Sequence, residues 1–122
     1  MDVVFERIAQ QDIGGVLNAA DPFIISQSDR IVALAERRTI PGIYSVRQFL
    51  EAGGLMFYGT DGFKGYHVVG TYVGRILKGE KPGDLPVQES TKLELAINLK
   101  AAKALRITIP TALLVHADEV IE

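Results

Sequence analysis

The amino-acid sequence predicts an α/β fold in which helices flank an open parallel sheet. Short apolar segments at 13–18, 41–45 and 55–58 have the length and flanking turn residues of buried strands. Segments with the apolar spacing of amphipathic helices separate and follow these strands. Strands separated by such helices pair in parallel through right-handed crossovers. With no internal repeat or linker, residues 1–122 are expected to form one domain.

The chain begins with a short helical pattern that ends before Asp12. After the first strand, Pro22 restricts Asp21 to extended geometry and breaks the strand pattern. Ser26 or Ser28 is then expected to cap a helix with an apolar side. This helix leads to the second strand.

Capping residues also mark the rest of the chain. Ser45 is expected to cap a short helix at 46–52, which a Gly-Gly pair terminates. A long amphipathic helix follows the third strand and stops at Gly79. Residues 87–97 then alternate as an extended, partly exposed segment, and Asn98 caps another helix.

Composition excludes several classes of protein. The hydrophobic content of 48% and charged content of 23% are those of a globular domain. A net charge of −2 gives no basic face for nucleic acid, so no nucleic-acid partner is expected. The chain lacks cysteine, which excludes disulfides and thiol catalysis. It also has no apolar run of about 20 residues that would span a membrane.

No pattern of catalytic or metal-binding residues is found. The only histidines, His67 and His116, lie in helical patterns without metal-ligand spacing. No serine sits in a Gly-x-Ser-x-Gly elbow, and no glycine-rich phosphate loop occurs. We therefore expect a protein that is not an enzyme and has no cofactor or metal.

Several strings in the chain resemble one family. They are IVALAERRTIPGIY, FLEAGGLMFYG, ILKGEKPGDLPV and LELAINLKAAKAL, within a similarity that extends from Ile13 to Glu122. The sequence resembles the C-terminal lobe of substrate-binding proteins of bacterial ABC transporters, which have the Rossmann-like type I periplasmic-binding fold. The N-terminal lobe of full-length members has no counterpart in this sequence.

The resemblance implies non-covalent capture of a small solute, such as an amino acid, between two lobes that close by hinge motion. It also implies an ABC permease as partner and a periplasmic location. The N-terminus lacks the pattern of a signal peptide, so the expected location is cytoplasmic if Met1 is the natural start. The alternative function is a stand-alone cytoplasmic interaction or sensor module derived from this lobe.

The predicted site lies in the three loops after the strands, because ligands of open parallel sheets bind beyond the carboxyl ends of the strands. From the residues alone, Asp21 and Asp61 either contact a ligand or act as a turn and a helix cap. The resemblance places all three loops at the cleft. The candidate ligand-binding residues, all expected at one edge of the sheet, are Asp21, Phe23, Tyr44, Ser45, Tyr58, Thr60 and Asp61. Their side chains, aromatic rings included, are expected to be accessible.

Two further expectations concern the second half of the chain. The long helix carries an apolar stripe formed by Phe63, Tyr66, Val69, Val73 and Leu77. If this stripe packs on the other lobe in the family, it is uncovered here, which predicts a homodimer or swapped oligomer. Where relatives commonly have glycine after the Lys-Ala-Leu helix, this chain has Arg106, so we expect that helix to continue or to end differently.

Overall fold

The computed structural model describes residues 1–60, 62–89 and 92–122, without the side chain of Phe63. The prediction at Asp61 lies outside the described residues. The chain divides into two compact units, residues 1–59 with 94–122 and residues 60–93, which are described separately below. The prediction of a single domain stays a prediction.

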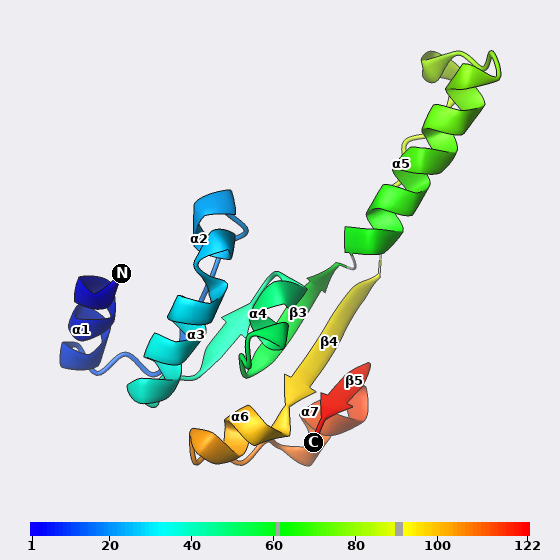
Figure 1. The fold of residues 1–122 in the computed structure, drawn as a ribbon. Helices are drawn as coiled ribbons and strands as arrows, with labels where there is room; N and C mark the ends of the chain where they lie inside the picture. Colours follow the sequence, from blue (N-terminus) through cyan, green and yellow to red (C-terminus); the bar gives the residue numbers. More distant parts are fainter. Residues whose placement is uncertain (61, 90–91) are drawn as a thin grey trace. The chain divides into compact units, whose positions relative to one another are not determined.

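The sheet is five-stranded, with the strands in the order in which they occur along the chain. The strands are β1 (Val16–Leu17), β2 (Gly42–Tyr44), β3 (Met56–Thr60), β4 (Leu93–Asn98) and β5 (Glu119–Ile121). The first three pair in parallel, as do β4 and β5. β3 and β4 run in opposite directions (Figure 1). The predicted α/β class is confirmed, and the sheet is parallel except at this central junction.

Helices cover both faces of the sheet. In this unit they are α1 (Asp2–Gln10), α2 (Pro22–Ser26), α3 (Ser28–Arg37), α4 (Arg47–Glu51), α6 (Leu99–Ala104) and α7 (Thr111–His116). Consecutive residues of β3 show the two layers, because side chains alternate across a strand. Met56 belongs to a buried cluster with Ala102 of α6, whereas Phe57 belongs to one with Leu50 of α4.

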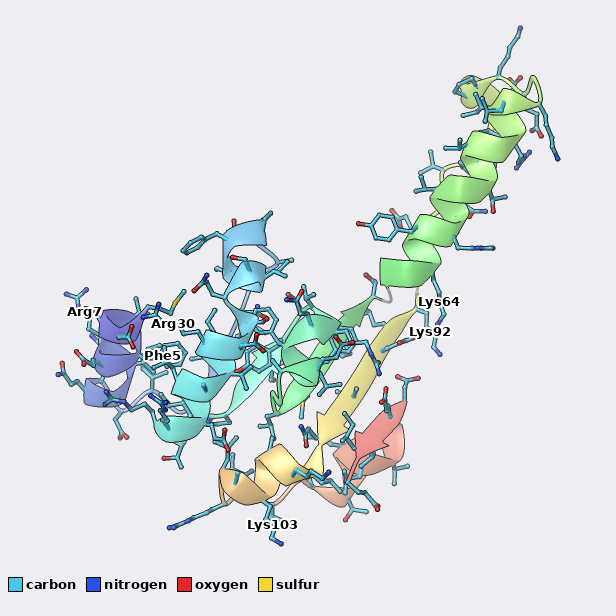
Figure 2. The ribbon with its side chains drawn as sticks, in the orientation of Figure 1. Phe5, Arg7, Arg30, Lys64, Lys92 and Lys103 are labelled. Atoms are coloured by element: carbon cyan, nitrogen blue, oxygen red, sulfur yellow. The ribbon has the colours of Figure 1, made fainter. Side chains whose placement is uncertain are left out.

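The aromatic pair Tyr44–Phe49 anchors the layer that contains α3 and α4. The two rings stack 4.8 Å apart with an interplanar angle of 4°. A Cβ on Gly42 would lie 2.4 Å from the Tyr44 hydroxyl oxygen, and one on Gly54 would lie 2.8 Å from its ring. These two glycines therefore leave the space that the tyrosine ring occupies. Phe5 adds α1 to this layer and lies between α1 and α3 (Figure 2).

Five helices end in the same way, with a left-handed residue followed by a backbone hydrogen bond to the carbonyl five residues earlier. The left-handed residues are Asp12, Thr39, Gly53, Gly79 and Arg106. The predicted stops at Gly53 and Gly79 are confirmed. The expectation for Arg106 is wrong: α6 ends in a left-handed cap although the residue is not glycine, with φ at 57°. The amide of Ile107 donates to the Ala102 carbonyl at 2.9 Å and closes this cap.

Two predicted helix caps are wrong. α3 follows Gln27 without a side-chain cap, because the short helix α2, which the sequence analysis did not predict, comes directly before it. α4 follows Val46, also without a side-chain cap, so Ser45 is not its cap. The predicted cap at Asn98 is confirmed: its Oδ1 accepts from the Ala101 amide at 3.1 Å.

The second unit consists of α5 (Gly62–Leu77), the 3₁₀ turn Pro82–Asp84 and a segment that returns along the helix. The Tyr72 hydroxyl donates to the Pro86 carbonyl at 2.5 Å, and the Arg75 guanidinium lies over the Tyr72 ring. Arg75 also forms a bidentate ion pair with Glu80, in which Nε donates to Oε1 and Nη2 donates to Oε2. These contacts attach the returning segment to one side of α5.

The opposite side of α5 is exposed within its own unit. Tyr66 is 78% exposed and Leu77 is 83% exposed, and Val69 and Val73 are also exposed. A Cβ on Gly70 or Gly74 would meet no atom of the described residues within 4 Å beyond the backbone of the helix itself. Among the described residues, no helix has the length and apolar character needed to cross a membrane.

We predict that Arg106→Gly stabilises the protein by about 0.5–1 kcal/mol, because glycine adopts positive φ without the steric cost of a Cβ. Urea unfolding at neutral pH measures the change. Arg106→Ala is the control, since it removes the charge but keeps the Cβ, and it should not stabilise. Equal stabilisation by both variants would contradict this explanation.

Candidate functional site

The carboxyl ends of β1, β2 and β3 lie at one edge of the sheet, since the three strands are parallel. The first residues beyond β1 and β2 are in direct contact there. The Ser45 amide donates to Oδ1 of Asn18 at 3.0 Å. A Cβ on Gly59 would lie 2.6 Å from the Ser45 carbonyl oxygen, so the end of β3 also approaches Ser45 closely. The structure thus brings together the starts of the first two predicted loops and the end of the third strand.

Two polar atoms at this edge have no hydrogen-bond partner in the part of the chain that the structure describes. They are Nδ2 of Asn18 and Oγ of Ser45, and both are buried although their residues are only half-buried. Buried polar groups in proteins are nearly always paired, so an unpaired group is a reason to suspect a ligand or water partner. The predicted site residue Ser45 therefore carries a hydroxyl that no other described group uses.

Asp21 and Phe23 lie on the loop after β1 and in α2. Oδ1 of Asp21 accepts from the amides of Phe23 at 2.9 Å and Ile24 at 3.2 Å. The turn expected as the alternative for Asp21 is therefore present, and the same carboxylate oxygen also caps α2; its second oxygen is not used by these bonds. Phe23 is 68% exposed, so its ring is available for contact.

The expected accessibility of Tyr44 is wrong. Its side chain is 1% exposed, because it turns back from the end of β2 into the core. Burial raises the pKa of the Tyr44 phenol to about 12 by desolvating the charged form. The ring was expected in the loop because Tyr44 directly precedes Ser45, but the glycines at 42 and 54 create space for it in the core.

The predicted residues of the third strand are exposed where the structure describes them. Tyr58 is 51% exposed and Thr60, the last residue of β3, is also exposed. Continuing the β2–β3 register by one residue places Tyr58 beside Ser45. The strand pairing therefore places the exposed aromatic residue Tyr58 next to Ser45 in the sheet.

The nearest basic residue along the chain after Ser45 is already paired. Arg47 donates to Oε2 of Glu119 at 2.5 Å, and this hydrogen bond raises the pKa of the Arg47 guanidinium. The described residues contain no group of three His, Cys, Asp or Glu side chains suited to a metal ion. The arrangement at this edge can therefore offer hydrogen-bond donors and aromatic surface to a ligand.

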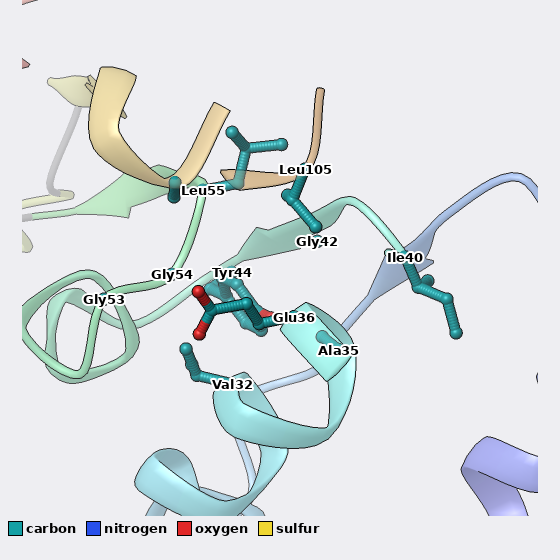
Figure 3. Close-up of a pocket in the computed structure, with 11 residues that line it drawn as sticks. Val32, Ala35, Glu36, Ile40, Gly42, Tyr44, Gly53, Gly54, Leu55 and Leu105 are labelled. Carbon is teal, nitrogen blue, oxygen red and sulfur yellow. The ribbon is translucent and has the colours of Figure 1, made fainter. Parts of the chain in front are cut away.

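A hollow at the other end of these strands is too small for a solute. It is lined by residues that include Val32, Ala35, Gly42, Tyr44 and Gly54 (Figure 3), and its volume is about 20 Å³. Pockets for small ligands usually measure about 300–1,000 Å³, whereas this hollow has room for about one water molecule. It is a packing defect next to the Tyr44 ring.

Sequence reasoning missed the role of Asn18. The residue begins the predicted loop 18–23, but nothing in the sequence shows that its amide holds Ser45. That bond joins residues 27 positions apart, so it depends on the pairing of β1 with β2. A polar residue directly after a predicted strand is the only local signal that could have drawn attention to it.

Comparison with known proteins identifies the family of the chain. Residues 1–121 match the model of the ABC transporter substrate binding protein family. The fold is that of periplasmic-binding-protein-like domains. The chain therefore belongs to the ABC transporter substrate-binding protein family, and the resemblance recognised from the sequence is confirmed. No curated protein sequence matches the chain.

Solved structures show the same fold over 98% of the chain. A conserved domain protein from Vibrio cholerae is 28% identical with a TM-score of 0.86. An ABC domain from Streptococcus pneumonia in complex with L-Trp has the same identity and TM-score. A ligand-free, open substrate-binding protein with adhesive properties from Clostridium difficile is 22% identical, with a TM-score of 0.68. The chain spans only about 40% of the length of these structures.

We predict that the free energy of unfolding falls between pH 10 and pH 12 by up to about 2–3 kcal/mol because of Tyr44. The unfolded tyrosine loses its proton near pH 10, whereas the folded one keeps it until about pH 12. The folded state therefore binds more protons in this range, and stability decreases as pH rises. Urea unfolding of the wild type and of Tyr44→Phe at several pH values measures the effect. The Tyr44→Phe variant should lack this fall in the free energy of unfolding. Wild-type and variant stabilities that change in parallel with pH would contradict the prediction.

Proposed function

We propose that the chain acts as a non-catalytic solute-binding component of an ABC transporter, corresponding to the C-terminal lobe of such a protein. In this role it takes part in the uptake of a small solute such as an amino acid, in the periplasm and together with an ABC permease. The observation that carries the proposal is the meeting of Asn18, Ser45 and Gly59 at one edge of the sheet, where two polar atoms have no partner among the described residues. Membership in the family supports the same conclusion.

The exposed aromatic side chains support a solute with an apolar or ring-shaped part. Phe23 and Tyr58 are both more than half exposed at this side of the molecule, where burial against a ligand would be favourable. The Streptococcus structure holds L-Trp, an amino acid with a large aromatic ring. We therefore propose aromatic amino acids as the first solutes to test.

One lobe covers only part of a solute. Well-bound small ligands bury about 70–90% of their surface, which in this family requires a second lobe. The entropy lost when the solute is immobilised is nearly the same with one lobe as with two. The chain by itself therefore makes about half of the contacts with the solute, but the whole entropy of immobilising the solute is still lost.

We predict that the 122-residue chain binds amino acids only weakly, with a Kd near the millimolar range. Half of the roughly 8 kcal/mol of a micromolar interaction leaves about 4 kcal/mol. Isothermal titration calorimetry with a panel of aromatic and aliphatic amino acids, small amides and carboxylates measures this. Micromolar binding by a monomer would contradict the half-site, whereas tight binding by a dimer would indicate a cleft rebuilt from two copies or a stand-alone module.

We also propose that two copies associate through the exposed side of α5, as a homodimer or a swapped oligomer. The stripe of Tyr66, Val69, Val73 and Leu77 is uncovered within its unit. The glycines at 70 and 74 lie between these residues along the helix, and a Cβ added to either would meet no described atom within 4 Å. Each helical glycine costs up to about 1 kcal/mol relative to alanine, a cost that close packing of a second copy would offset.

We predict that Val73→Lys weakens this association at least about tenfold, because it places a charge in the apolar contact. Analytical ultracentrifugation over micromolar to millimolar concentrations measures the dimer dissociation constant. Thr71→Lys is the matched control: both residues are β-branched and exposed on α5, but Thr71 lies outside the stripe. A wild-type protein that stays monomeric over this range would refute the proposal, as would equal effects of the two variants.

A further inference from the structure

The orientation of the Asn18 side-chain amide is fixed by a hydrogen bond. Because the Ser45 backbone amide can only donate, the atom of Asn18 that it contacts at 3.0 Å must be the carbonyl oxygen Oδ1. Nδ2 therefore points away from this bond and carries two N–H groups. Neither has an acceptor among the described residues. The usual ambiguity between the two ends of an asparagine amide does not arise here.

The missing partner at this position is a hydrogen-bond acceptor. Nδ2 can only donate. The nearby Ser45 hydroxyl has one O–H to donate and likewise has no partner among the described groups. The oxygen Oδ1 of Asn18 is already occupied by the Ser45 amide. A group that offers acceptors would satisfy both unpaired residues, whereas an ammonium group, which only donates, would satisfy neither N–H of Nδ2.

A carboxylate fits this pair of donors better than other common acceptors. It has two oxygens that accept in one plane, and hydrogen bonds to a charged acceptor are about twice as strong as neutral ones. The negative charge would not be neutralised by Arg47, which is engaged with Glu119. The binding would therefore rest on neutral donors to a charged acceptor, which are stronger hydrogen bonds than those between neutral groups.

We propose that Asn18 Nδ2 and Ser45 Oγ hold the carboxylate of the bound solute, so that this lobe selects carboxylic acids. The inference rests on the proposed solute-binding function and names the group of the solute that this lobe recognises. Both atoms are covered in the chain alone, so the Ser45 side chain rotates and the covering loops move slightly when the solute binds. The exposed ring of Tyr58, which the register places beside Ser45, then lies next to the rest of the solute.

The test compares solutes that differ in one charged group. The first pair is indole-3-propionate, which has a carboxylate and no amine, and tryptamine, which has an amine and no carboxylate. The second pair, butyrate and butylamine, makes the same comparison without a ring, and L-tryptophan carries both groups. Titrations of the ¹⁵N-labelled chain follow the side-chain amide signals of Asn18 and the backbone amide signal of Ser45. We expect L-tryptophan and both acids to shift these signals, and both amines to leave them unchanged.

Asn18→Asp is the informative variant. It keeps the acceptor for the Ser45 amide, replaces Nδ2 by an oxygen of nearly the same size and places a negative charge against the solute carboxylate. We expect the affinity for the acids to fall by about tenfold or more. Ser45→Ala should weaken it less, because it removes one donor and adds no charge. Thermal unfolding confirms that each variant is folded, and Ser45→Ala, which removes one of the two donors, serves in its place if the Asp variant is not.

The possible failures are distinguishable. Binding of L-tryptophan with shifts confined to other residues would overturn the carboxylate site and leave the solute-binding function standing. The carboxylate site would also be overturned if the amines shift the Asn18 signals and the acids do not. A third contradicting result is an Asn18→Asp variant that binds the acids as well as the wild type does. Lack of any shift with every solute at tens of millimolar would overturn the solute-binding function and this inference together.

Discussion

The burial of the Tyr44 ring is the constraint on which the arrangement of the sheet edge depends. The ring turns from the end of β2 into the core, stacks on Phe49 and occupies space that exists only because residues 42 and 54 are glycine. It thereby ties β2 to α4 and to the turn before β3. The next residue, Ser45, is then held between Asn18 and Gly59. A polar group is thus placed at the sheet edge by an aromatic group inside the core.

Much of the fold could be predicted from the sequence because its signals are local. The predicted strands near 41–45 and 55–58, the helix stops at Gly53 and Gly79 and the cap at Asn98 all rest on patterns within a few residues, and the structure has them. Features set by distant contacts were missed. β5 pairs with β4 and has too few residues for a pattern, and the left-handed cap at Arg106 is imposed by its surroundings on a residue that disfavours it.

The difference between local signals and distant contacts also explains which predictions failed at the candidate site. The position of the loops follows from parallel strands and could be predicted, whereas the direction of each side chain could not. Tyr44 was expected at the surface and lies in the core. Asp21 was left open between two roles and is a helix cap. Asn18 drew no attention, although it makes the hydrogen bond that joins the first two loops.

The central claim is that the carboxyl edge of β1–β3 is one half of a solute-binding cleft. The most direct measurement is a crystal structure of the chain grown with tens of millimolar L-tryptophan. Electron density for the amino acid is expected beside Asn18, Ser45 and Tyr58. Density only at the small hollow beside Tyr44, on α5 or elsewhere on the surface would contradict the claim, because the solute would then bind without the groups that the strands bring together.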